Sequence, residues 1–388
     1  MKNEKQHTNS RRDFLKKTAA ASVAMASSSA LITACSNAQE KDGKQNASGG
    51  SDKSKTYEWS LSTTWPPNFP VFGEGIDLFA KRVNTLSDGR MTIKVFGAGE
   101  KVPQPELFDA VGNGIIEMGH GAAYYWAGKA KAAQFFAAVP FGLNAQQMNA
   151  WINNGGGYEL WKEVYAPFNV IPFLGGNTGV QMAGWFNKEI NSLADLNGLK
   201  MRIPGLGGAV LSKAGGTAVS VAGGEIYTNL ERGVIDATEW IGPYHDYTLG
   251  LHKIAKYYYA PGWHEPGTVL EFTVNKQKYE ALPPDLQGII RAAAAEASTW
   301  MFCEFEVKNN EYLNKIRAES DAELRQLPDE VIAGLRTKTQ EVLEEQAAED
   351  PLFKKVYKSF SAFRKNAAEW AALTEKPFYN KIQANFMG

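Results

Sequence analysis

One stretch of this chain occurs twice. Residues 106–117 read as a short amphipathic helix, a glycine that ends it and the apolar start of a strand (Glu-Leu-Phe-Asp-Ala-Val-Gly-Asn-Gly-Ile-Ile-Glu). Residues 225–236 repeat the apolar positions, the glycine and the final acid in register (Glu-Ile-Tyr-Thr-Asn-Leu-Glu-Arg-Gly-Val-Ile-Asp). The copies lie about one third of the chain apart, which is too far for a solenoid repeat. We therefore expect two similar α/β lobes, with a cleft between them that suits a small ligand.

The order of the other elements agrees with an α/β fold class. In the first lobe we expect strands at 57–63, 91–96 and 115–118 and helices at 71–86 and 105–111. This alternation of strands and helices predicts parallel pairing within the lobe, and for the two lobes together we expect mixed, largely parallel sheets. In the second lobe we expect strands at 180–187, 200–203, 218–221 and 235–239 and helical segments at 192–196, 209–214 and 224–232. Strands at 257–260 and 268–275 then run back toward the first lobe.

Helical patterns take over from Pro284. A helix from about 289 to 320 contains no Gly or Pro and exceeds the usual length range. Further helices are expected at 331–348, at 353–374 and just after Pro377. The chain therefore divides into lobe I (57–178 and 267–283), lobe II (179–266) and a C-terminal helical region (284–388).

The first 35 residues have the pattern of an export signal. A paired arginine at 11–12 precedes a weakly apolar Ala/Ser-rich stretch, which is typical of twin-arginine export. The stretch ends in Ile-Thr-Ala-Cys, which resembles a lipobox, so we expect Cys35 to carry a lipid anchor. The alternative is a plain cleavage site nearby, with Cys35 incidental. Residues 36–56 lack apolar periodicity and predict a flexible linker.

Composition limits the possible partners. Without the signal, which holds six Lys/Arg and two Asp/Glu, 35 basic and 40 acidic residues remain, a net charge near −5. No basic stripe is present, so a nucleic-acid partner is not expected. Cys303 is the only other cysteine, so no intramolecular disulfide is expected in the body. Its apolar neighbours at 300–302 predict a buried structural thiol.

Motifs of common enzyme classes are absent from the sequence. It has no Gly-x-Ser-x-Gly elbow, no Gly-x-x-x-x-Gly-Lys-Ser/Thr loop and no His-Glu-x-x-His motif. The five histidines have no zinc-binding spacing, and His264-Glu265 lacks a second histidine. An exported, cofactor-dependent oxidoreductase stays open as the alternative from another class, since twin-arginine export carries prefolded proteins.

Three runs carry a resemblance to a known family. They are Gly-Val-Gln-Met-Ala-Gly-Trp-Phe at 179–186, Asp-Leu-Asn-Gly-Leu-Lys-Met-Arg-Ile at 195–203, and 225–240, which ends in Asp-Ala-Thr-Glu-Trp. Together they resemble the substrate-binding proteins of TRAP (tripartite ATP-independent periplasmic) transporters. Glu239-Trp240 points to the branch that binds 2-oxo acids such as pyruvate. The resemblance implies a periplasmic solute-binding protein fold, an extracytoplasmic location and no catalysis. The protein would deliver a small carboxylate to the membrane permease subunits.

Arg202 is the main candidate for binding a carboxylate. It ends a predicted strand, and the planar fork of an arginine matches a carboxylate with two parallel hydrogen bonds. An arginine within an apolar strand needs a partner, because an unpaired buried charge is costly. A structural ion pair and a ligand carboxylate are equally good partners on this ground. The resemblance implies the second, since the family places its substrate-carboxylate arginine here.

A second set of residues offers oxygen atoms. Gln181, Glu239 and Glu265 carry side-chain oxygens, and Trp240 can add its backbone carbonyl. Hard cations such as Ca²⁺ prefer oxygen ligands, and Na⁺ is a plausible analogue. The resemblance implies that these positions hold a metal ion that also touches the substrate, with Gln181 and Trp240 contacting both. Without it, each acid is better explained as a strand-end charge or a hinge ion pair. No organic cofactor is expected.

Aromatic residues in the first lobe are candidates for the pocket wall. Trp65, Tyr124 and Tyr125 follow strand ends, where such rings can line a ligand site and offer a hydroxyl or indole N–H. Ordinary core packing is the alternative for at least half of the aromatic residues in these positions. If the two tyrosines are extended, their side chains point in opposite directions, so only one of them faces the cleft.

The long helix at 289–320 also bears on assembly. Its apolar side chains, including Trp300, Phe302, Phe305 and Tyr312, need a cover. The resembled branch includes dimers swapped through such a helix, which implies a homodimer. The alternative is a monomer whose helix folds along both lobes.

Overall fold

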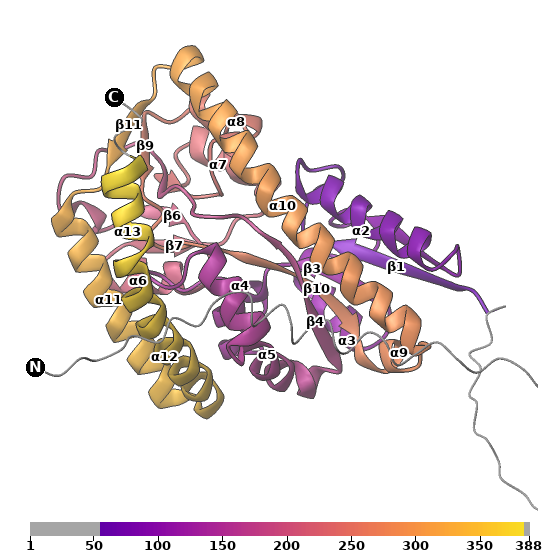
Figure 1. Cartoon of the computed structure of the whole chain (residues 1–388). Helices are drawn as coiled ribbons and strands as arrows, with labels where there is room; N and C mark the ends of the chain where they lie inside the picture. Colours follow the sequence, from indigo (N-terminus) through magenta and orange to yellow (C-terminus); the bar gives the residue numbers. More distant parts are fainter. Residues whose placement is uncertain (1–54, 384–388) are drawn as a thin grey trace, which may run out of the picture. The chain divides into compact units, whose positions relative to one another are not determined.

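The computed structural model describes residues 55–383. The expected twin-arginine signal, the lipobox with Cys35 and nearly all of the expected linker lie outside the described residues. Two β-sheets organise the described part of the chain, with helices around them (Figure 1).

The first sheet has the strand order β2-β1-β3-β10-β4. Its strands are β1 (Tyr57–Thr63), β2 (Met91–Phe96), β3 (Met118–Gly121), β4 (Val170–Asn177) and β10 (Val269–Asn275). β1 pairs in parallel with β2 and β3. β10 lies between β3 and β4 and runs antiparallel to both. The sheet is therefore mixed, and it takes one strand from a segment far along the chain.

The second sheet repeats this plan. Its order is β11-β9-β5-β8-β6-β7, and its strands are β5 (Gly184–Phe186), β6 (Lys200–Arg202), β7 (Thr217–Val219), β8 (Ala237–Thr238), β9 (Tyr257–Ala260) and β11 (Glu323–Gln326). β6 is parallel to β7 and β8, whereas β5 is antiparallel to β8 and β9. Strand for strand, the order β7-β6-β8-β5-β9 matches β2-β1-β3-β10-β4. This match confirms the prediction of two similar α/β lobes with mixed sheets. The parts of the chain built around the first and the second sheet are called the first and the second unit below.

The repeated stretch occupies equivalent places in the two units. Its helices are α3 (Leu107–Gly112) and α7 (Ile226–Glu231). Two residues after the end of each helix stands a glycine with a positive φ, Gly114 at 72° and Gly233 at 69°, a conformation that favours glycine. The final acids also act alike: Glu117 accepts a hydrogen bond from the backbone N–H of Ser60, and Asp236 accepts one from Lys200. Each acid thereby ties the turn to the neighbouring strand.

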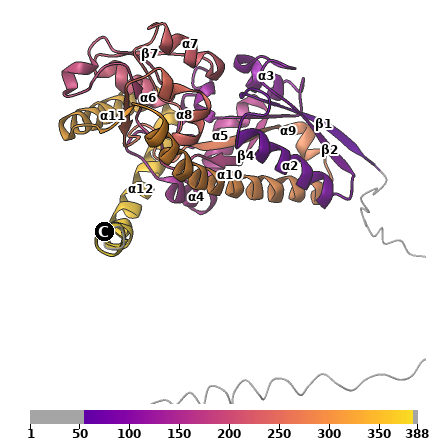
Figure 2. The ribbon, with the colours of Figure 1, turned by 90° about the horizontal axis from the view of Figure 1, so that it is seen from above.

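Helices cover the sheets and form the C-terminal part (Figures 1 and 2). Their bounds are α2 (Phe72–Leu86), α4 (Ala145–Asn154), α5 (Gly157–Tyr165), α6 (Gly205–Lys213), α8 (Pro243–Thr248), α9 (Lys276–Glu280), α10 (Pro284–Glu319), α11 (Asp329–Glu349), α12 (Pro351–Leu373) and α13 (Glu375–Pro377). Short 3₁₀ turns lie at Gln104–Glu106, Ala123–Trp126, Lys131–Phe136, Ala166–Phe168, Leu193–Leu196, Gly223–Glu225 and Leu251–Lys253, and a π-helical turn lies at Phe378–Gln383. Within residues 55–383, no helix has the length and apolar character needed to cross a membrane.

The long helix α10 braces both units from within the chain. It packs against α2 and β4 of the first unit and against α8 of the second. Phe305 is buried in these contacts, and Trp300, Phe302 and Tyr312 are half-buried. The apolar face that the sequence left without a cover is therefore largely covered by the chain itself.

Several sequence predictions need correction. The strands after the two repeated helices begin at Met118 and Ala237, later than expected, because residues 115–117 and 234–236 form the turns. The strand expected at 180–187 is only β5, and the helix expected at 209–214 starts at Gly205. The sequence predicted no element for 145–177, where α4, α5 and β4 lie. β11 joins the second sheet from a region expected to be only helical.

The prediction of a buried structural thiol at Cys303 was wrong. The residue lies on the solvent side of α10 and is exposed, whereas Met301 and Phe305 point into the core. The helix is amphipathic, so sequence neighbours of a buried residue face outward.

Candidate ligand and metal site

The predicted polar residues of the second unit meet at one edge of its sheet. Arg202 is the last residue of β6, and Glu239 directly follows β8. Because these adjacent strands are parallel, their carboxyl ends lie side by side. Gln181 precedes β5, which runs antiparallel to β8, and Glu265 follows β9, so the chain brings both to the same edge. A backbone hydrogen bond from Gln181 N–H to the Glu265 carbonyl (3.2 Å) joins the two segments.

Arg202 is buried and pairs with Glu239. One guanidinium nitrogen contacts the Glu239 carboxylate and also donates to its backbone carbonyl at 3.2 Å. The guanidinium Nε donates to the Val221 carbonyl at 3.4 Å, and its carbon lies 5.0 Å from the centroid of the Trp240 ring. Burial opposes the charge, but the neighbouring Glu239 carboxylate raises the pKa of Arg202 above its ordinary value. Both partners thus neutralise each other in an almost dry site.

Gln181 and Glu265 form a second hydrogen-bonded group. The Gln181 amide donates to the Glu265 carboxylate at 2.8 Å, and the Thr268 hydroxyl donates to the same oxygen at 2.5 Å. The amide also lies 3.1 Å from the Thr178 hydroxyl. Its oxygen, Oε1, is buried without a hydrogen-bond partner. A buried carbonyl-type oxygen without a donor is a free ligand for a cation or a polar group.

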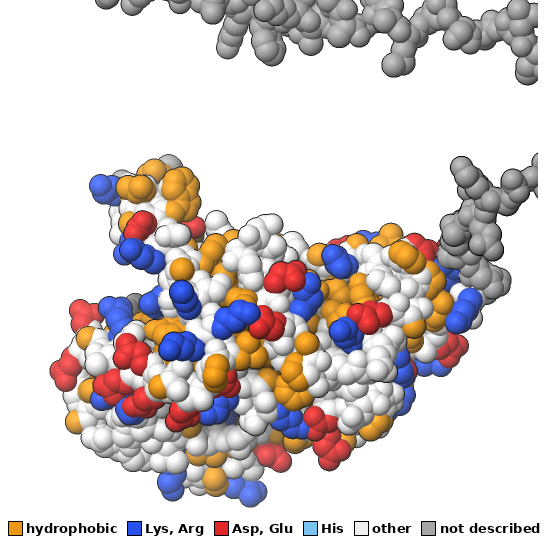
Figure 3. Space-filling view, turned by 90° about the horizontal axis from the view of Figure 1, so that it is seen from below, with side chains coloured by type: hydrophobic (Ala, Val, Ile, Leu, Met, Phe, Trp, Pro, Cys, Tyr) orange, Lys and Arg blue, Asp and Glu red, His pale blue; other side chains and the backbone are white. Residues whose placement is uncertain are grey.

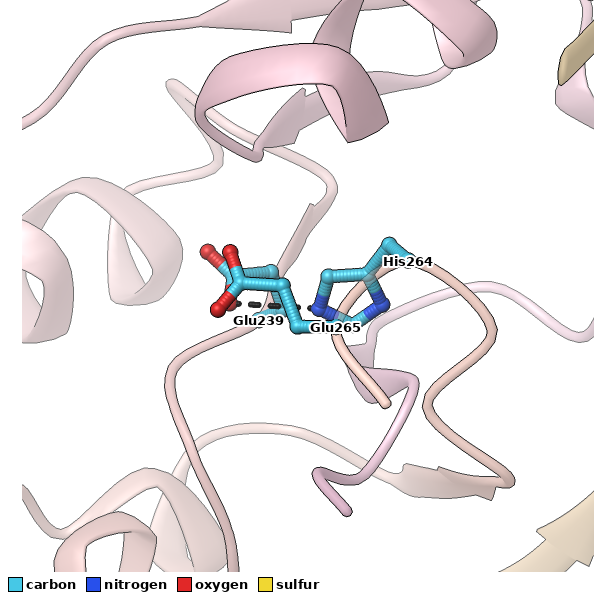
Figure 4. Close-up of side chains that lie close together, drawn as sticks. All are labelled: Glu239, His264 and Glu265. Atoms are coloured by element: carbon cyan, nitrogen blue, oxygen red, sulfur yellow. Dashed lines mark hydrogen bonds and ion pairs between the residues drawn. The ribbon is translucent and has the colours of Figure 1, made fainter. Parts of the chain in front are cut away.

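His264 completes an acidic cluster that the sequence did not predict (Figure 4). Its Nε2 lies 3.3 Å from Glu239 Oε2, and the ligand atoms of Glu239, His264 and Glu265 all lie within 4.8 Å of one another. In Figure 4 the two carboxylates lie next to each other beside the imidazole ring. The sequence showed only a histidine without a zinc-binding spacing; its place beside Glu239 depends on the loop after β9, which no periodicity predicts.

The closeness of the two acids has an electrostatic consequence. Burial, followed by the charge of Glu239, raises the pKa of Glu265 to about 7. Two ionised carboxylates in one dry pocket repel each other, and a cation between them removes that repulsion. The oxygen-rich donor set and the unpartnered Gln181 oxygen fit a hard cation such as Ca²⁺ or Na⁺.

The first unit supplies the aromatic residues. Trp65 follows β1 and is buried, and Tyr124 and Tyr125 lie in the 3₁₀ turn that follows β3. This turn is helical and not extended, so the condition under which only one tyrosine would face the cleft is not met, and both tyrosines line the cavities there. Their rings are edge-to-face, with centroids 4.9 Å apart. Burial raises the pKa of Tyr125 to about 12, so its hydroxyl keeps its proton.

All six residues predicted to contact the substrate line one small pocket between the units. It has a volume of about 10 Å³, and its walls include Trp65, Tyr124, Tyr125, Gln181, Arg202 and Trp240. Thr178 and Thr268 are further wall residues that the sequence analysis did not predict. A cavity of about 570 Å³ shares four of the six predicted residues and continues outward over α6. Glycine at position 205 permits the close approach here, since a Cβ would come within 3.0 Å of Tyr124.

Residues 61–350 match the family model described as bacterial extracellular solute-binding protein, family 7. A monocarboxylate 2-oxoacid-binding periplasmic protein of Nostoc is 44% identical over 322 residues, which cover 83% of this chain and 88% of that protein. The chain belongs to family 7, the solute-binding proteins of TRAP transporters. It is therefore an extracytoplasmic binding protein of a transport system and not an enzyme.

Solved structures of this family are similar over nearly their whole length. A TRAP periplasmic solute-binding protein from Colwellia psychrerythraea, with bound calcium and pyruvate, is 43% identical, with a TM-score of 0.83, and covers 84% of this chain and 100% of that one. One from Pseudoalteromonas atlantica, with sodium and pyruvate, is 42% identical, with a TM-score of 0.82 and the same coverage. A third, from Bordetella bronchiseptica, is 40% identical, with a TM-score of 0.84 and coverage of 86% and 99%; it is a dimer with calcium and picolinate in one site and an apo site.

Proposed function

We propose that this protein captures a small monocarboxylate, most readily a 2-oxo acid such as pyruvate, together with a Ca²⁺ or Na⁺ ion. The observation that carries the proposal is the convergence of Arg202 with Gln181, Glu239 and Glu265 on one pocket walled by aromatic rings. Similar proteins bind pyruvate or picolinate with calcium or sodium. The loaded protein would then dock on the permease subunits of a TRAP transporter.

Each group has a role in this proposal. Arg202 receives the ligand carboxylate with its planar fork. The cation would be held by oxygen atoms, namely Gln181 Oε1, the carboxylates of Glu239 and Glu265 and the Trp240 carbonyl. When bound, it would supply positive charge that favours the polar oxygen atoms of the ligand.

The pocket residues exchange partners when the ligand is bound. Arg202 and Glu239 pair with each other in the structure, and the space beside them, about 10 Å³, holds no more than about one water. A carboxylate that takes Arg202 from Glu239 would leave Glu239 free for the cation. Neither exchange is favourable alone, because each leaves one buried charge without a partner.

The outer cavity selects the rest of the ligand. Of the residues that line its 570 Å³, only Arg202 is charged; Pro105, Ala209, Val219 and Val221 are among the apolar ones. An uncharged extension on the 2-oxo acid fits this lining, whereas a second carboxylate finds no cation there. Dicarboxylates should therefore bind much more weakly than monocarboxylates of similar size.

Isothermal titration of purified protein with acids of increasing length tests this function. Pyruvate and 2-oxobutyrate should bind in Ca²⁺ or Na⁺ buffer, and 2-oxoglutarate should not. Mass spectrometry of the protein as purified should reveal a small acid that is unchanged after incubation. If no monocarboxylate raises the melting temperature or gives binding heat, the proposed ligand class is wrong.

We also propose that the chain is exported by the twin-arginine route and anchored through Cys35. The support is the sequence of the first 35 residues and the extracytoplasmic location of the family. Metabolic labelling with a radioactive fatty acid tests the anchor: the wild-type chain should be labelled and fractionate with membranes, and Cys35→Ala should lose both properties. A labelled Cys35→Ala chain would contradict the proposal.

A homodimer is the proposed assembly, but through a different surface from the one that the sequence suggested. Beyond Phe363, α12 and the turns after it expose Trp370 (64%), Leu373 (77%) and Tyr379 (60%). Figure 3 shows apolar side chains gathered at the tip of this projecting end, with charged side chains beside them. A contiguous apolar patch of this kind is typical of a protein–protein contact, and the similar Bordetella protein is a dimer.

Light scattering at micromolar concentration distinguishes the two surfaces. Trp370→Glu should convert the dimer to a monomer. Val307→Glu, a control at an exposed position on α10 (61%), should leave the dimer intact. A wild-type monomer, or a dimer lost only with Val307→Glu, would refute this assignment.

We propose that the two lobes predicted from the sequence move relative to each other when the ligand binds. The divisions are lobe I (57–178 and 267–283), lobe II (179–266) and the C-terminal helical region (284–388). Ligand binding should reduce the radius of gyration measured by small-angle X-ray scattering, since solute-binding proteins close by hinge motion. An unchanged radius on saturation would argue against two mobile lobes.

A further inference from the structure

Each of the two pocket tryptophans is held by a buried histidine in the same way. Trp240 Nε1 donates to His245 Nδ1 at 3.2 Å, and His245 Nε2 lies 2.8 Å from the Pro70 carbonyl. Trp65 Nε1 donates to His120 Nδ1 at 2.8 Å, and His120 Nε2 lies 2.9 Å from the Gly175 carbonyl. Neither histidine has any measurable exposed surface.

The chemistry of these partners fixes the tautomer. An indole N–H can only donate, so the facing Nδ1 must be unprotonated. The proton of the neutral ring then resides on Nε2, where a carbonyl oxygen accepts it. Burial lowers the pKa of His120 to about 4 and that of His245 to about 3, so both rings are neutral at physiological pH. Each histidine therefore has both nitrogen atoms occupied and its orientation set.

Each chain of two hydrogen bonds, from a tryptophan through a histidine to a backbone carbonyl, is called a relay here, and the two relays differ in which units they connect. Trp65, His120 and Gly175 all belong to the first unit, following β1, in β3 and in β4. His245 lies in α8, just after β8 of the second unit, whereas Pro70 precedes α2 of the first unit. The Trp240 relay thus crosses between the units. The rings of Phe69, Phe72 and Phe305 surround His245, with centroids 4.7–4.9 Å from its own.

We propose that His245 is a positioning residue that couples ligand binding at Trp240 to contact between the two units. Through its two nitrogens, it ties the tryptophan that walls the pocket to the backbone of the opposite unit. Contact between the units then holds Trp240 against the ligand, and the ligand in turn favours the contact, because such linkage is reciprocal. This inference rests on the proposed function, since it assigns a role in ligand retention.

The geometry suggests how the two hydrogen bonds can be separated. In His245→Asn, the side-chain oxygen replaces Nδ1 as the acceptor for Trp240, but the side chain is too short to reach Pro70. In His245→Gln, the amide reaches Pro70 and the acceptor for Trp240 is displaced. The same two substitutions at His120 serve as a matched control, because that relay stays within one unit.

Dissociation of a bound 2-oxo acid, followed by stopped-flow fluorescence, measures the coupling. His245→Asn and His245→Gln should each release the acid about tenfold faster than wild type, because each breaks one of the two hydrogen bonds that make the link. His120→Asn and His120→Gln should stay close to the wild-type rate. A wild-type rate for either His245 variant, or an equal acceleration in the His120 variants, would overturn the proposal.

A second measurement needs no variant of His245. The indole N–H of Trp240, assigned by the loss of its ¹H–¹⁵N resonance in Trp240→Phe, should exchange more slowly with solvent when the acid is bound. Unchanged exchange overturns the coupling even if the His245 variants fail to fold. If wild-type protein binds no acid at all, the proposed function fails, whereas binding with unchanged exchange refutes only the role of His245.

Discussion

Replacing Arg202 by lysine should separate the charge of this residue from its shape. Arg202 donates to Glu239 and to the Val221 carbonyl at once and lies over the Trp240 ring. Lysine keeps the positive charge but lacks the planar fork, so it can meet a carboxylate with only one directed hydrogen bond. Loss of a buried charge-assisted pair costs about 2–5 kcal/mol. At about 1.4 kcal/mol for each tenfold change, the affinity of Arg202→Ala should fall by about 30-fold to several thousand-fold.

For Arg202→Lys, the loss of affinity should lie near the lower end of this range. Isothermal titration in saturating cation should show a Kd at least tenfold weaker than that of the wild type. Arg325→Lys is the matched control, because Arg325 lies in β11 of the same sheet but makes an exposed ion pair with Glu323, for which about 0–1 kcal/mol is expected. Since Arg202→Ala leaves Glu239 buried and short of a partner, its melting temperature must be measured as well. A near wild-type Kd for Arg202→Ala, with an intact fold, would refute the assignment of this residue to the ligand carboxylate.

Further outcomes are expected from the remaining site and core residues. Exhaustive dialysis against chelator in sodium-free buffer should weaken acid binding, and restoring Ca²⁺ or Na⁺ should recover it; unchanged affinity would make Glu239 and Glu265 structural. Gln181→Leu should weaken the effect of the cation on acid affinity, whereas Tyr125→Phe should change it little. Burial raises the pKa of Glu271 from 4.5 to about 7. Glu271 therefore contributes at most about 3 kcal/mol to the free energy of unfolding, and this contribution is fully present below pH 4.5 and is lost as the pH rises through 7. Denaturant unfolding at pH 5 and pH 8 should show this loss in wild type and less of it in Glu271→Gln.

Local patterns predicted the parts of the fold that depend on a single stretch of chain. The helix and glycine of the repeated stretch could be predicted because a positive φ at Gly114 and Gly233 is needed wherever such a helix ends. The short strands of the second sheet could not be bounded, since two or three residues carry no periodicity. β11 pairs with β9 across more than sixty positions of chain, and nothing in its own polar sequence indicates that partner.

The residues of the site also divide into those that a single stretch of chain predicts and those whose position depends on distant parts of the chain. Arg202 and Glu239 could be placed together because both end adjacent parallel strands. His264 and the threonines at 178 and 268 lie in loops or at strand ends whose course depends on how the chain returns to the first sheet. The orientation of the tyrosine pair stayed open for a similar reason: four residues of 3₁₀ turn differ from an extended strand only through their surroundings.

The charges in the pocket explain why a binding protein for an anion places two acids beside its arginine. With both carboxylates ionised, Arg202, Glu239 and Glu265 sum to one negative charge, and an anionic ligand would add a second. Burial, followed by the charge of Glu239, already raises the pKa of Glu265, so the pocket disfavours a second carboxylate charge even without the ligand. A divalent cation brings the sum with ligand to zero, and a monovalent one halves the excess. An arginine alone would bind many anions, whereas this arrangement binds an anion well only when a cation and a second ligand oxygen complete the same shell, so selectivity comes from the pair of acids.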